Sequence, residues 1–206
     1  MNSYNSAPLS SIVSYSNQEE IIEAVQSAKI AQKEWKNISI SKRIEFLRSL
    51  YDLMLHEKEN LAQSVSNDMG VPIKLARDDV QYGLNYFLWY LQNAERSLSS
   101  EIVFESDSEV HTVFYEPKGV IAAITPWNYP CMLFVWACIQ PLLSGNTVIW
   151  KISKEAIYTG MSIDSIIKKS KLPSGVLTEI YGDGMVGDFL TDQDIDGVTF
   201  TGSTYV

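Results

Sequence analysis

The segment ITPWNYP, residues 124–130, places an indole and an amide side chain, Trp127 and Asn128, between two prolines. Proline fixes its own φ angle and restricts the residue before it, so Pro126 and Pro130 predict a rigid turn. An amide held in such a turn can donate a hydrogen bond to a ligand. Two interpretations are open at this point: a rigid turn within a core, or the edge of a binding site.

Three glycines, Gly182, Gly184 and Gly187, form the pattern G-x-G-x-x-G between a strand-like and a helix-like segment. This pattern is typical of turns that hold a diphosphate against the start of a helix. The acidic partner expected about twenty residues later would fall at or beyond residue 206, and the pattern follows the third strand of its series rather than the first. A tight turn with a close helix-to-sheet contact is the competing interpretation.

The two cysteines, Cys131 and Cys138, lie on one apolar, helix-like run. Along a helix they would be roughly 10 Å apart, too far for a disulfide. We expect both to be core thiols, although a helix start could make Cys131 reactive by lowering its pKa. Neither His56 nor His111 has neighbours at metal-ligand spacing, so no metal site is expected.

Sixteen basic and twenty-five acidic side chains give a formal net charge of −9, which repels phosphate backbones and anionic lipid. Nucleic acid is therefore not an expected partner. The longest apolar run, residues 131–139, is far shorter than the ~20 residues of a membrane helix, so no membrane partner is expected either. The first residues, MNSYNSAPLSS, lack the pattern of a secretory signal, which predicts a cytoplasmic location.

Helical periodicity dominates the first hundred residues. Ser16 and Glu19 have the spacing of a capping box before a helix that should end near Trp35. Ser41 is the expected cap of a second helix, and Gly70 should end a third. A fourth helix carries an aromatic band, which could stack on a ligand but whose helical spacing favours the core: Tyr82, Tyr86, Phe87, Trp89 and Tyr90.

From residue 101 the pattern changes to β-rich segments. EIVFES and VHTVFYE flank a polar tip at Asp107 and Ser108, which predicts a hairpin over residues 101–117. Strand-like and helix-like segments then alternate, as is typical of a parallel sheet with ligands at the carboxyl ends of its strands. Polar and turn residues gather at four such ends: ITPWN, WKISK, YGDG and FTGS.

The chain resembles the NAD(P)-dependent aldehyde dehydrogenase superfamily in four segments with matching order and spacing: EPKGVIAAITPWNYP, SGNTVIWKISKEA, LPSGVLTEIYGDG and FTGST. The resemblance implies an α/β fold with an incomplete Rossmann-like parallel sheet. Residues 1–100 would form the helical part of the cofactor domain, 101–117 an antiparallel oligomerisation hairpin, and 118–206 the dinucleotide-binding portion, with the catalytic domain absent. The hairpin implies a homo-oligomer.

The resemblance gives the ITPWNYP turn a role in catalysis. Asn128 matches the asparagine whose amide stabilises the oxyanion formed when a thiolate attacks an aldehyde carbonyl, an interaction typically worth ~3–4 kcal/mol. Trp127 would pack beside the cofactor, unless its indole simply belongs to the core.

Other matched residues would bind the dinucleotide. Lys151 matches a lysine that hydrogen-bonds the adenosine ribose, and Ser203 a serine that meets the diphosphate at a helix start. Gly182 and Gly187 would mainly permit close approach near the adenine. The full set implied at the cofactor is Thr125, Trp127, Lys151, Ser153, Lys154, Gly182, Gly187, Gly202 and Ser203.

One departure from the family concerns the cofactor. NAD-preferring members usually read Lys-Pro-x-Glu where this chain reads Lys151, Ile152, Ser153, Lys154. The carboxylate that would accept from the ribose 2′-hydroxyl is thus replaced by a cation, which should tolerate or favour a 2′-phosphate. The expected cofactor is NAD or NADP, with NADP favoured by Lys154; the alternative is that Lys154 points into solvent.

The second departure concerns catalysis. In the family, the catalytic cysteine and the general-base glutamate follow FTGST, and neither Cys131 nor Cys138 takes the nucleophile's place. Because acyl-enzyme chemistry needs both groups, we expect the chain alone not to oxidise aldehydes.

Three interpretations of the chain stay open. In the first, the chain is an N-terminal portion of the enzyme that keeps part of a dinucleotide site. In the second, it is a non-catalytic binding or interaction protein that associates with itself or with a longer relative. In the third, a second chain supplies the missing half of the enzyme, and the substrate is a small aldehyde. Apolar surface exposed at the hairpin and the sheet edge predicts self-association.

Overall fold

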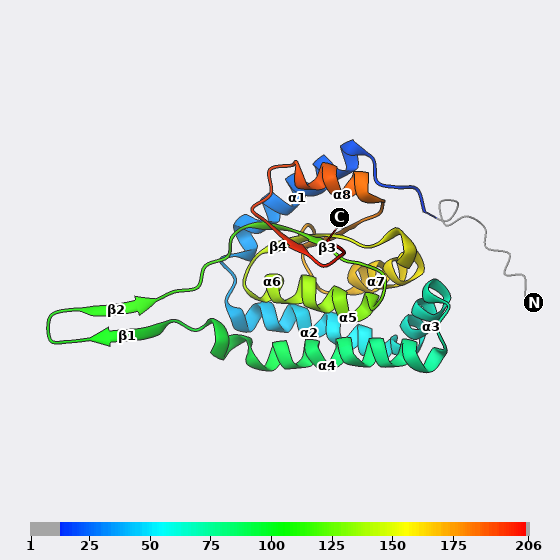
Figure 1. The fold of residues 1–206 in the computed structure, drawn as a ribbon. Helices are drawn as coiled ribbons and strands as arrows, with labels where there is room; N and C mark the ends of the chain where they lie inside the picture. Colours follow the sequence, from blue (N-terminus) through cyan, green and yellow to red (C-terminus); the bar gives the residue numbers. More distant parts are fainter. Residues whose placement is uncertain (1–12, 205–206) are drawn as a thin grey trace, which may run out of the picture.

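The computed structural model describes residues 13–204. A parallel four-stranded sheet lies between two layers of helices, and a long hairpin projects from one end of the molecule (Figure 1). Helices α1 and α8 lie on one face of the sheet and the remaining helices lie on the other. The α/β fold expected from the sequence is therefore confirmed.

Helix α1 (Gln18–Trp35) ends where its periodicity predicts, but its cap is one residue later than expected. The capping box is formed by Asn17 and Glu20, with each side chain accepting a hydrogen bond from the other residue's backbone N–H. Ser16 is instead joined to the sheet, since its N–H donates to the carbonyl of Tyr181 and its hydroxyl accepts from the Tyr181 N–H. A tertiary contact thus moves the helix start.

The next two helices confirm one predicted boundary and correct another. Helix α2 (Ile40–His56) is capped by Ser39, whose hydroxyl accepts from the Lys42 N–H, while Ser41 lies within the helix and its hydroxyl donates to Glu95. Helix α3 (Lys58–Met69) ends at Gly70, whose φ of 64° is the left-handed conformation that glycine adopts without strain.

Helix α4 (Ile73–Leu98) corrects the prediction for the aromatic band. Only Phe87 is fully buried, whereas Tyr82, Tyr86 and Trp89 are 52%, 41% and 54% exposed. The buried face of the helix includes Phe87 but otherwise consists of residues outside the band: Ala76, Val80, Gly83, Leu84, Leu91 and Ala94. The core prediction therefore holds for Phe87 and is wrong for Tyr82, Tyr86 and Trp89, which lie on the exposed face.

After the hairpin the chain alternates between strands and helices as predicted. The sheet has the order β5-β4-β3-β6, and all its neighbouring pairs are parallel. The elements are β3 (Val120–Ile124), α5 (Pro130–Phe134), a π-helical turn (Val135–Ile139), α6 (Gln140–Leu143), β4 (Thr147–Lys151), a 3₁₀ turn (Lys154–Ala156), α7 (Ile157–Lys169), β5 (Leu177–Ile180), α8 (Gly184–Thr191) and β6 (Gly197–Phe200).

The alternating residues of the central strands explain the two helical layers. On β3, Val120 and Ala122 pack in the cluster that contains α1 and α8, while Ile121 and Ala123 pack against the larger helical layer. Successive side chains of a strand point to opposite faces, so a strand buried on both faces is apolar throughout. Helices α2, α3 and α4 therefore share one core with one face of the sheet, while α1 and α8 cover the other face.

Strands β1 (Glu101–Glu105) and β2 (Val110–Val113) pair antiparallel and form the predicted hairpin. The hairpin extends away from the sheet and helices (Figure 1). Its apolar side chains are exposed, including Ile102 at 58% and Phe104 at 47%. Nothing within residues 13–204 covers them.

Candidate functional site

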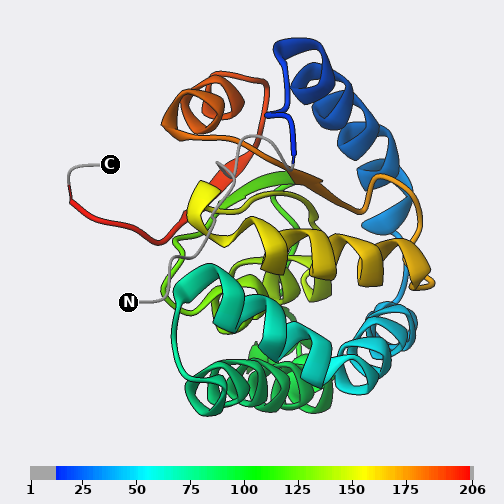
Figure 2. The same cartoon turned by 90° about the vertical axis from the view of Figure 1, so that its right-hand side faces the viewer.

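The four strand ends identified from the sequence form one row along the carboxyl edge of the sheet. Lys151 is paired in register with Ile180 of β5 and Ile124 of β3, and Ile124 is paired with Phe200 of β6. The loops that follow these residues consequently leave the sheet at the same end of the strands, the end that faces the viewer in Figure 2. The candidate site residues, which are distant in sequence, are thus gathered along this edge.

The first loop, residues 125–130, leads from β3 to α5. Thr125 is buried, and its hydroxyl accepts a hydrogen bond from the indole N–H of Trp150 at 2.9 Å, while its own N–H donates to the Lys151 carbonyl. Trp127 is 51% exposed and Asn128 is also exposed. The interpretation of Trp127 as a core indole is therefore wrong, and both side chains are accessible to a ligand.

A buried carboxylate that the sequence analysis missed holds the start of α5. Asp79 of α4 accepts hydrogen bonds from the backbone N–H groups of Cys131, at 3.1 Å, and Met132, at 3.0 Å. Burial raises the pKa of Asp79 to about 6, although these two hydrogen bonds oppose the shift. An aspartate four residues before a glycine on a helix gave no distinctive sequence signal.

The raised pKa of Asp79 predicts a pH-dependent stability. Between the ordinary value of 3.8 and about 6, the folded chain holds a proton that the unfolded chain has lost. The free energy of unfolding should therefore fall as pH rises through this window, by about 2–3 kcal/mol from this group. Urea titrations at several pH values measure the change, and Asp79→Asn should remove it. A wild-type curve and an Asp79→Asn curve with the same slope between pH 4 and pH 6 would contradict the assignment.

Lys151 ends β4 as predicted and is only 6% exposed. Its aliphatic stem passes α8 at Gly187, where a Cβ would lie 3.7 Å from the Lys151 Cδ. Burial lowers the pKa of Lys151, the nearby Asp183 carboxylate opposes that shift, and Lys154 adds to it. The ammonium group thus lies between one anion and one cation at the edge of the sheet.

The turn after β4 places its polar groups at the surface. The Ser153 hydroxyl accepts from the N–H of Glu155 at 3.3 Å and so caps the 3₁₀ turn. The Lys154 ammonium lies 4.0 Å from the Glu155 carboxylate, and about half of each side chain is exposed. Such an exposed pair is weak, so Lys154 can turn toward an anion at this edge.

The glycine-rich loop after β5 is built as a tight contact between helix and sheet. A Cβ at Gly182 would lie 2.3 Å from a methyl group of Val186, so only glycine fits against the first turn of α8. Asp183 caps the helix by accepting from the N–H of Met185 at 2.9 Å. This geometry agrees with the competing interpretation of the pattern, and it places a carboxylate beside Lys151.

The last loop follows β6. A Cβ at Gly202 would lie 2.4 Å from the tip of the Phe200 ring, so a side chain here would require this half-exposed ring to move. Ser203 is exposed at the same edge of the sheet. The helix start expected after Ser203 lies outside the described residues.

Neither cysteine is a nucleophile. Cys131 and Cys138 are at most 1% exposed, and burial raises the pKa of both thiols well above the ordinary value. The prediction that they are core thiols is confirmed, and the alternative of a reactive Cys131 is wrong.

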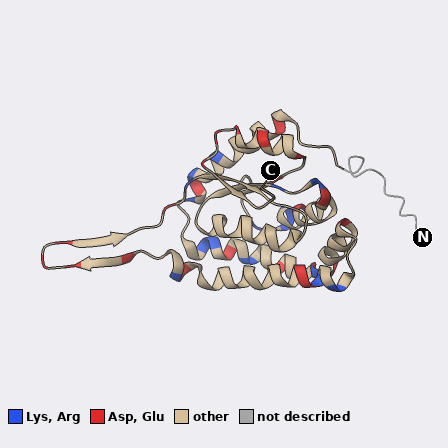
Figure 3. Ribbon diagram, viewed as in Figure 1, with Lys and Arg blue, Asp and Glu red and all other residues tan. Residues whose placement is uncertain are grey.

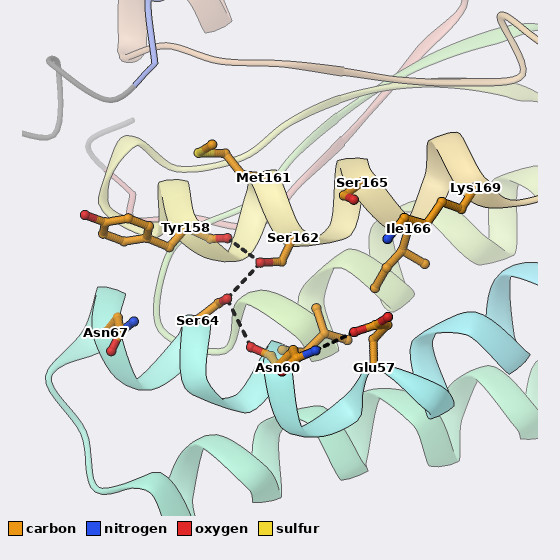
Figure 4. A pocket seen from close by; sticks show the side chains of 11 residues that line it. Glu57, Asn60, Ser64, Asn67, Tyr158, Met161, Ser162, Ser165, Ile166 and Lys169 are labelled. Atoms are coloured by element: carbon orange, nitrogen blue, oxygen red, sulfur yellow. Dashed lines mark hydrogen bonds between the residues drawn. The ribbon is translucent and has the colours of Figure 1, made fainter.

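A separate polar pocket lies between α3 and α7 (Figure 4). Its floor is a contact of 2.8 Å between the hydroxyls of Ser64 and Ser162, each of which also bonds to a carbonyl of its own helix. None of the site residues predicted from the sequence lines this pocket. It is not part of the candidate site.

The described residues offer neither a metal site nor a membrane-spanning helix. Residues 13–204 contain no cluster of three or more His, Cys, Asp or Glu side chains that could hold a metal ion. In the same part of the chain, no helix has the length and apolar character needed to cross a membrane.

Comparison with known sequences gives a consistent result. The aldehyde dehydrogenase family profile matches residues 2–206. A 1-pyrroline-5-carboxylate dehydrogenase of Staphylococcus epidermidis is 30% identical over 98% of this chain and 40% of its own length. The NADP/NAD-dependent aldehyde dehydrogenase PuuC of Escherichia coli is 36% identical over 83% of this chain and 35% of its own length.

Solved structures agree. An aldehyde dehydrogenase from Bartonella henselae superposes with a TM-score of 0.87 at 30% identity, over 93% of this chain and 40% of that one. An NADP-dependent glyceraldehyde-3-phosphate dehydrogenase from Bacillus halodurans, complexed with NADP, gives 0.85 at 31% identity, over 92% and 41%. The chain thus spans about 40% of the length of these relatives.

Proposed function

This chain belongs to the aldehyde dehydrogenase family, and from that premise we propose that it binds NAD or NADP along the carboxyl edge of its sheet, as the cofactor-binding part of an aldehyde-oxidising enzyme. The observation that carries the proposal is the row of strand ends at this edge, with the buried cation of Lys151 at its centre. Ligands of open parallel sheets bind outside the carboxyl ends of the strands.

The residues of this edge divide into groups with different contributions. Lys151 donates to ribose hydroxyls, Ser203 faces the diphosphate, and the tight turn at Gly182 keeps the chain compact where the adenosine lies. Thr125 and Trp127 lie in the same loop as Asn128 and would contact the cofactor on the side next to Asn128. The Thr125 hydroxyl accepts from the indole N–H of Trp150, which fixes the start of this loop. The bound cofactor would supply a hydride acceptor, which is the chemistry that the side chains themselves lack.

Asn128 is the proposed contribution of this chain to the chemical step. Its exposed amide donates to the oxygen of an aldehyde carbonyl as negative charge develops there. The attacking thiolate is not supplied by Cys131 or Cys138, whose thiols are buried and protonated. Aldehyde oxidation by this mechanism therefore requires a thiolate other than those of the described residues.

We expect NADP(H) to bind more tightly than NAD(H), because Lys154 stands where a carboxylate would accept from the 2′-hydroxyl. Titration of the purified chain, followed by tryptophan fluorescence and checked by calorimetry, tests both parts of the proposal. Saturable binding with NADP(H) preferred would support it. A dissociation constant for NADP(H) no tighter than for NAD(H) would remove the preference, and no binding of either up to millimolar concentration would remove the cofactor site.

A second candidate function, an interaction protein, is favoured by the hairpin. Its exposed apolar side chains form a ready surface for another chain, and between residues 101 and 117 it has acidic residues but no Lys or Arg (Figure 3). Isolated two-stranded hairpins are marginal in water, so a surface of this kind gains from being covered.

The hairpin predicts self-association that salt strengthens, because like charges on two hairpins repel each other less when screened. Light scattering after size exclusion should give a mass above the 23.2 kDa of one chain, rising between low and moderate salt. The double variant Ile102→Ser, Phe104→Ser should return the chain to a monomer, whereas Asp107→Asn at the tip should not. A compact monomer at high concentration of the wild type would refute the prediction.

A further inference from the structure

Helix α4 meets the first turn of α5 through two residues one helical turn apart. Asp79 is 2% exposed and accepts from the N–H groups of Cys131 and Met132. Gly83 is buried, and a Cβ there would lie 3.2 Å from the Cys131 carbonyl oxygen and 3.3 Å from the Met132 Cα. Because residues four apart share one face of a helix, Asp79 and Gly83 form a single contact surface against α5.

We propose that Asp79 and Gly83 are positioning residues for Asn128: together they fix the first turn of α5, and through it the direction of the Asn128 amide. Asn128 precedes Pro130, the first residue of α5, by two positions and is exposed. Packing around the amide therefore does not orient it, and the backbone of the turn sets the direction of the Asn128 Cα–Cβ bond from which the amide extends. The inference rests on the proposed function only in taking this amide as the group whose direction matters.

The chemistry of Asp79 supports a fixed geometry rather than a loose cap. A carboxylate that accepts from two N–H groups makes stronger hydrogen bonds than a neutral acceptor does, and here two successive N–H groups of the helix start are held by the two oxygens of one side chain. Gly83 adds a steric limit, since any side chain would push the two helices apart. The Asp79 carboxylate acts electrostatically on the Cys131 thiol, as does Asp68, whereas no charged neighbour is among the causes of the raised pKa of Asp79 itself.

The chain contains a matched control for this arrangement. Asp68 of α3 accepts from the N–H groups of Tyr158, at 3.0 Å, and Thr159, at 2.7 Å, at the start of α7. Asp68 thus accepts from two successive backbone N–H groups at the start of α7, as Asp79 does at the start of α5. Asp68→Asn and Asp79→Asn each replace a carboxylate that accepts from two backbone N–H groups by an amide. Asp68 additionally accepts from the Thr159 hydroxyl at 2.7 Å, and only Asp79→Asn should reach Asn128.

The test is nuclear magnetic resonance of the ¹⁵N-labelled full chain without cofactor or aldehyde. The side-chain amide signals of Asn128 are identified by their loss in Asn128→Ala. In Asp79→Asn we expect these signals to shift, and the amide hydrogens of Cys131 and Met132 to exchange roughly ten- to hundredfold faster. In Asp68→Asn the Asn128 signals should stay, while exchange accelerates at Tyr158 and Thr159. In the wild type, the Asn128 signals should follow pH with a midpoint of about 6.

A folded Asp79→Asn chain with unmoved Asn128 signals would overturn the proposal. If Asp79→Asn does not fold, Gly83→Ala and the wild-type pH series decide, and unmoved Asn128 signals in both would overturn it equally. Because no ligand enters this experiment, its result is separate from the titrations above. Failure to bind NADP(H) would remove the proposed function and leave the positioning role standing.

Discussion

Replacing Lys151 by alanine is expected to weaken the binding of NAD(H) and NADP(H) alike, by about ten- to hundredfold. The ammonium of Lys151 is at the centre of the row of strand ends, where it can donate to the ribose hydroxyls that both cofactors carry. Hydrogen bonds that involve a charged group are worth about 1.5–3 kcal/mol, more than those between neutral groups. Burial of the side chain adds to the effect, because the charge is less screened there than at the surface.

Calorimetric titration of both cofactors measures the change, with thermal unfolding as the check that the variant is folded. Lys168→Ala is the matched control, since Lys168 is an exposed lysine of α7 that is paired with Asp164. Its loss removes the same formal charge from the chain and should leave both dissociation constants unchanged. Equal affinities of Lys151→Ala and Lys168→Ala for the cofactors would place the binding site elsewhere.

The strand ends could be predicted from the sequence because their signals are local. The apolar runs that become β3 and β4 are buried on both faces, and the polar residues that follow them mark where each strand leaves the sheet. Parallel pairing then brings Asn128, Lys151 and the loop at Gly182 to one edge without further information. The hairpin could also be predicted from the sequence, because its β-rich segments and its polar tip lie within a few residues of each other.

What the sequence analysis missed depends on contacts between distant elements. Asp79 caps a helix that begins 51 residues later, and no spacing rule connects it to Cys131. Ser16 could cap α1 by its type and spacing, but its contacts with Tyr181 leave that role to Asn17. The prediction that the aromatic band of α4 is buried was wrong for a related reason. Residues on more than one side of the helix follow the helical period, and only the neighbouring helices decide which side is buried.

The proposed preference for NADP would depend on the charges around Lys151, and Lys154→Glu should then reverse it. In the wild type Lys154 can meet a 2′-phosphate, while the variant offers a carboxylate that accepts from a 2′-hydroxyl and repels the phosphate. Each of these changes is worth about 1.5–3 kcal/mol, so the ratio of the two affinities should swing by roughly a thousandfold toward NAD(H). Lys154→Gln, which removes the cation without adding an anion, should give about half of that change in free energy.

Asp183 provides an independent test of the same arrangement. Its carboxylate lies close enough to act on Lys151, and it would face a 2′-phosphate bound at this edge from the neighbouring loop. Asp183→Asn should therefore improve NADP(H) binding more than NAD(H) binding, opposite in sign to Lys154→Glu. Titration of the two single variants and the double variant with both cofactors gives the coupling between them. If Lys154→Glu leaves the ratio of the NADP(H) and NAD(H) affinities unchanged, Lys154 points into solvent and this turn gives no preference for NADP. If the ratio changes only in Asp183→Asn, the loop after β5 discriminates between the two cofactors.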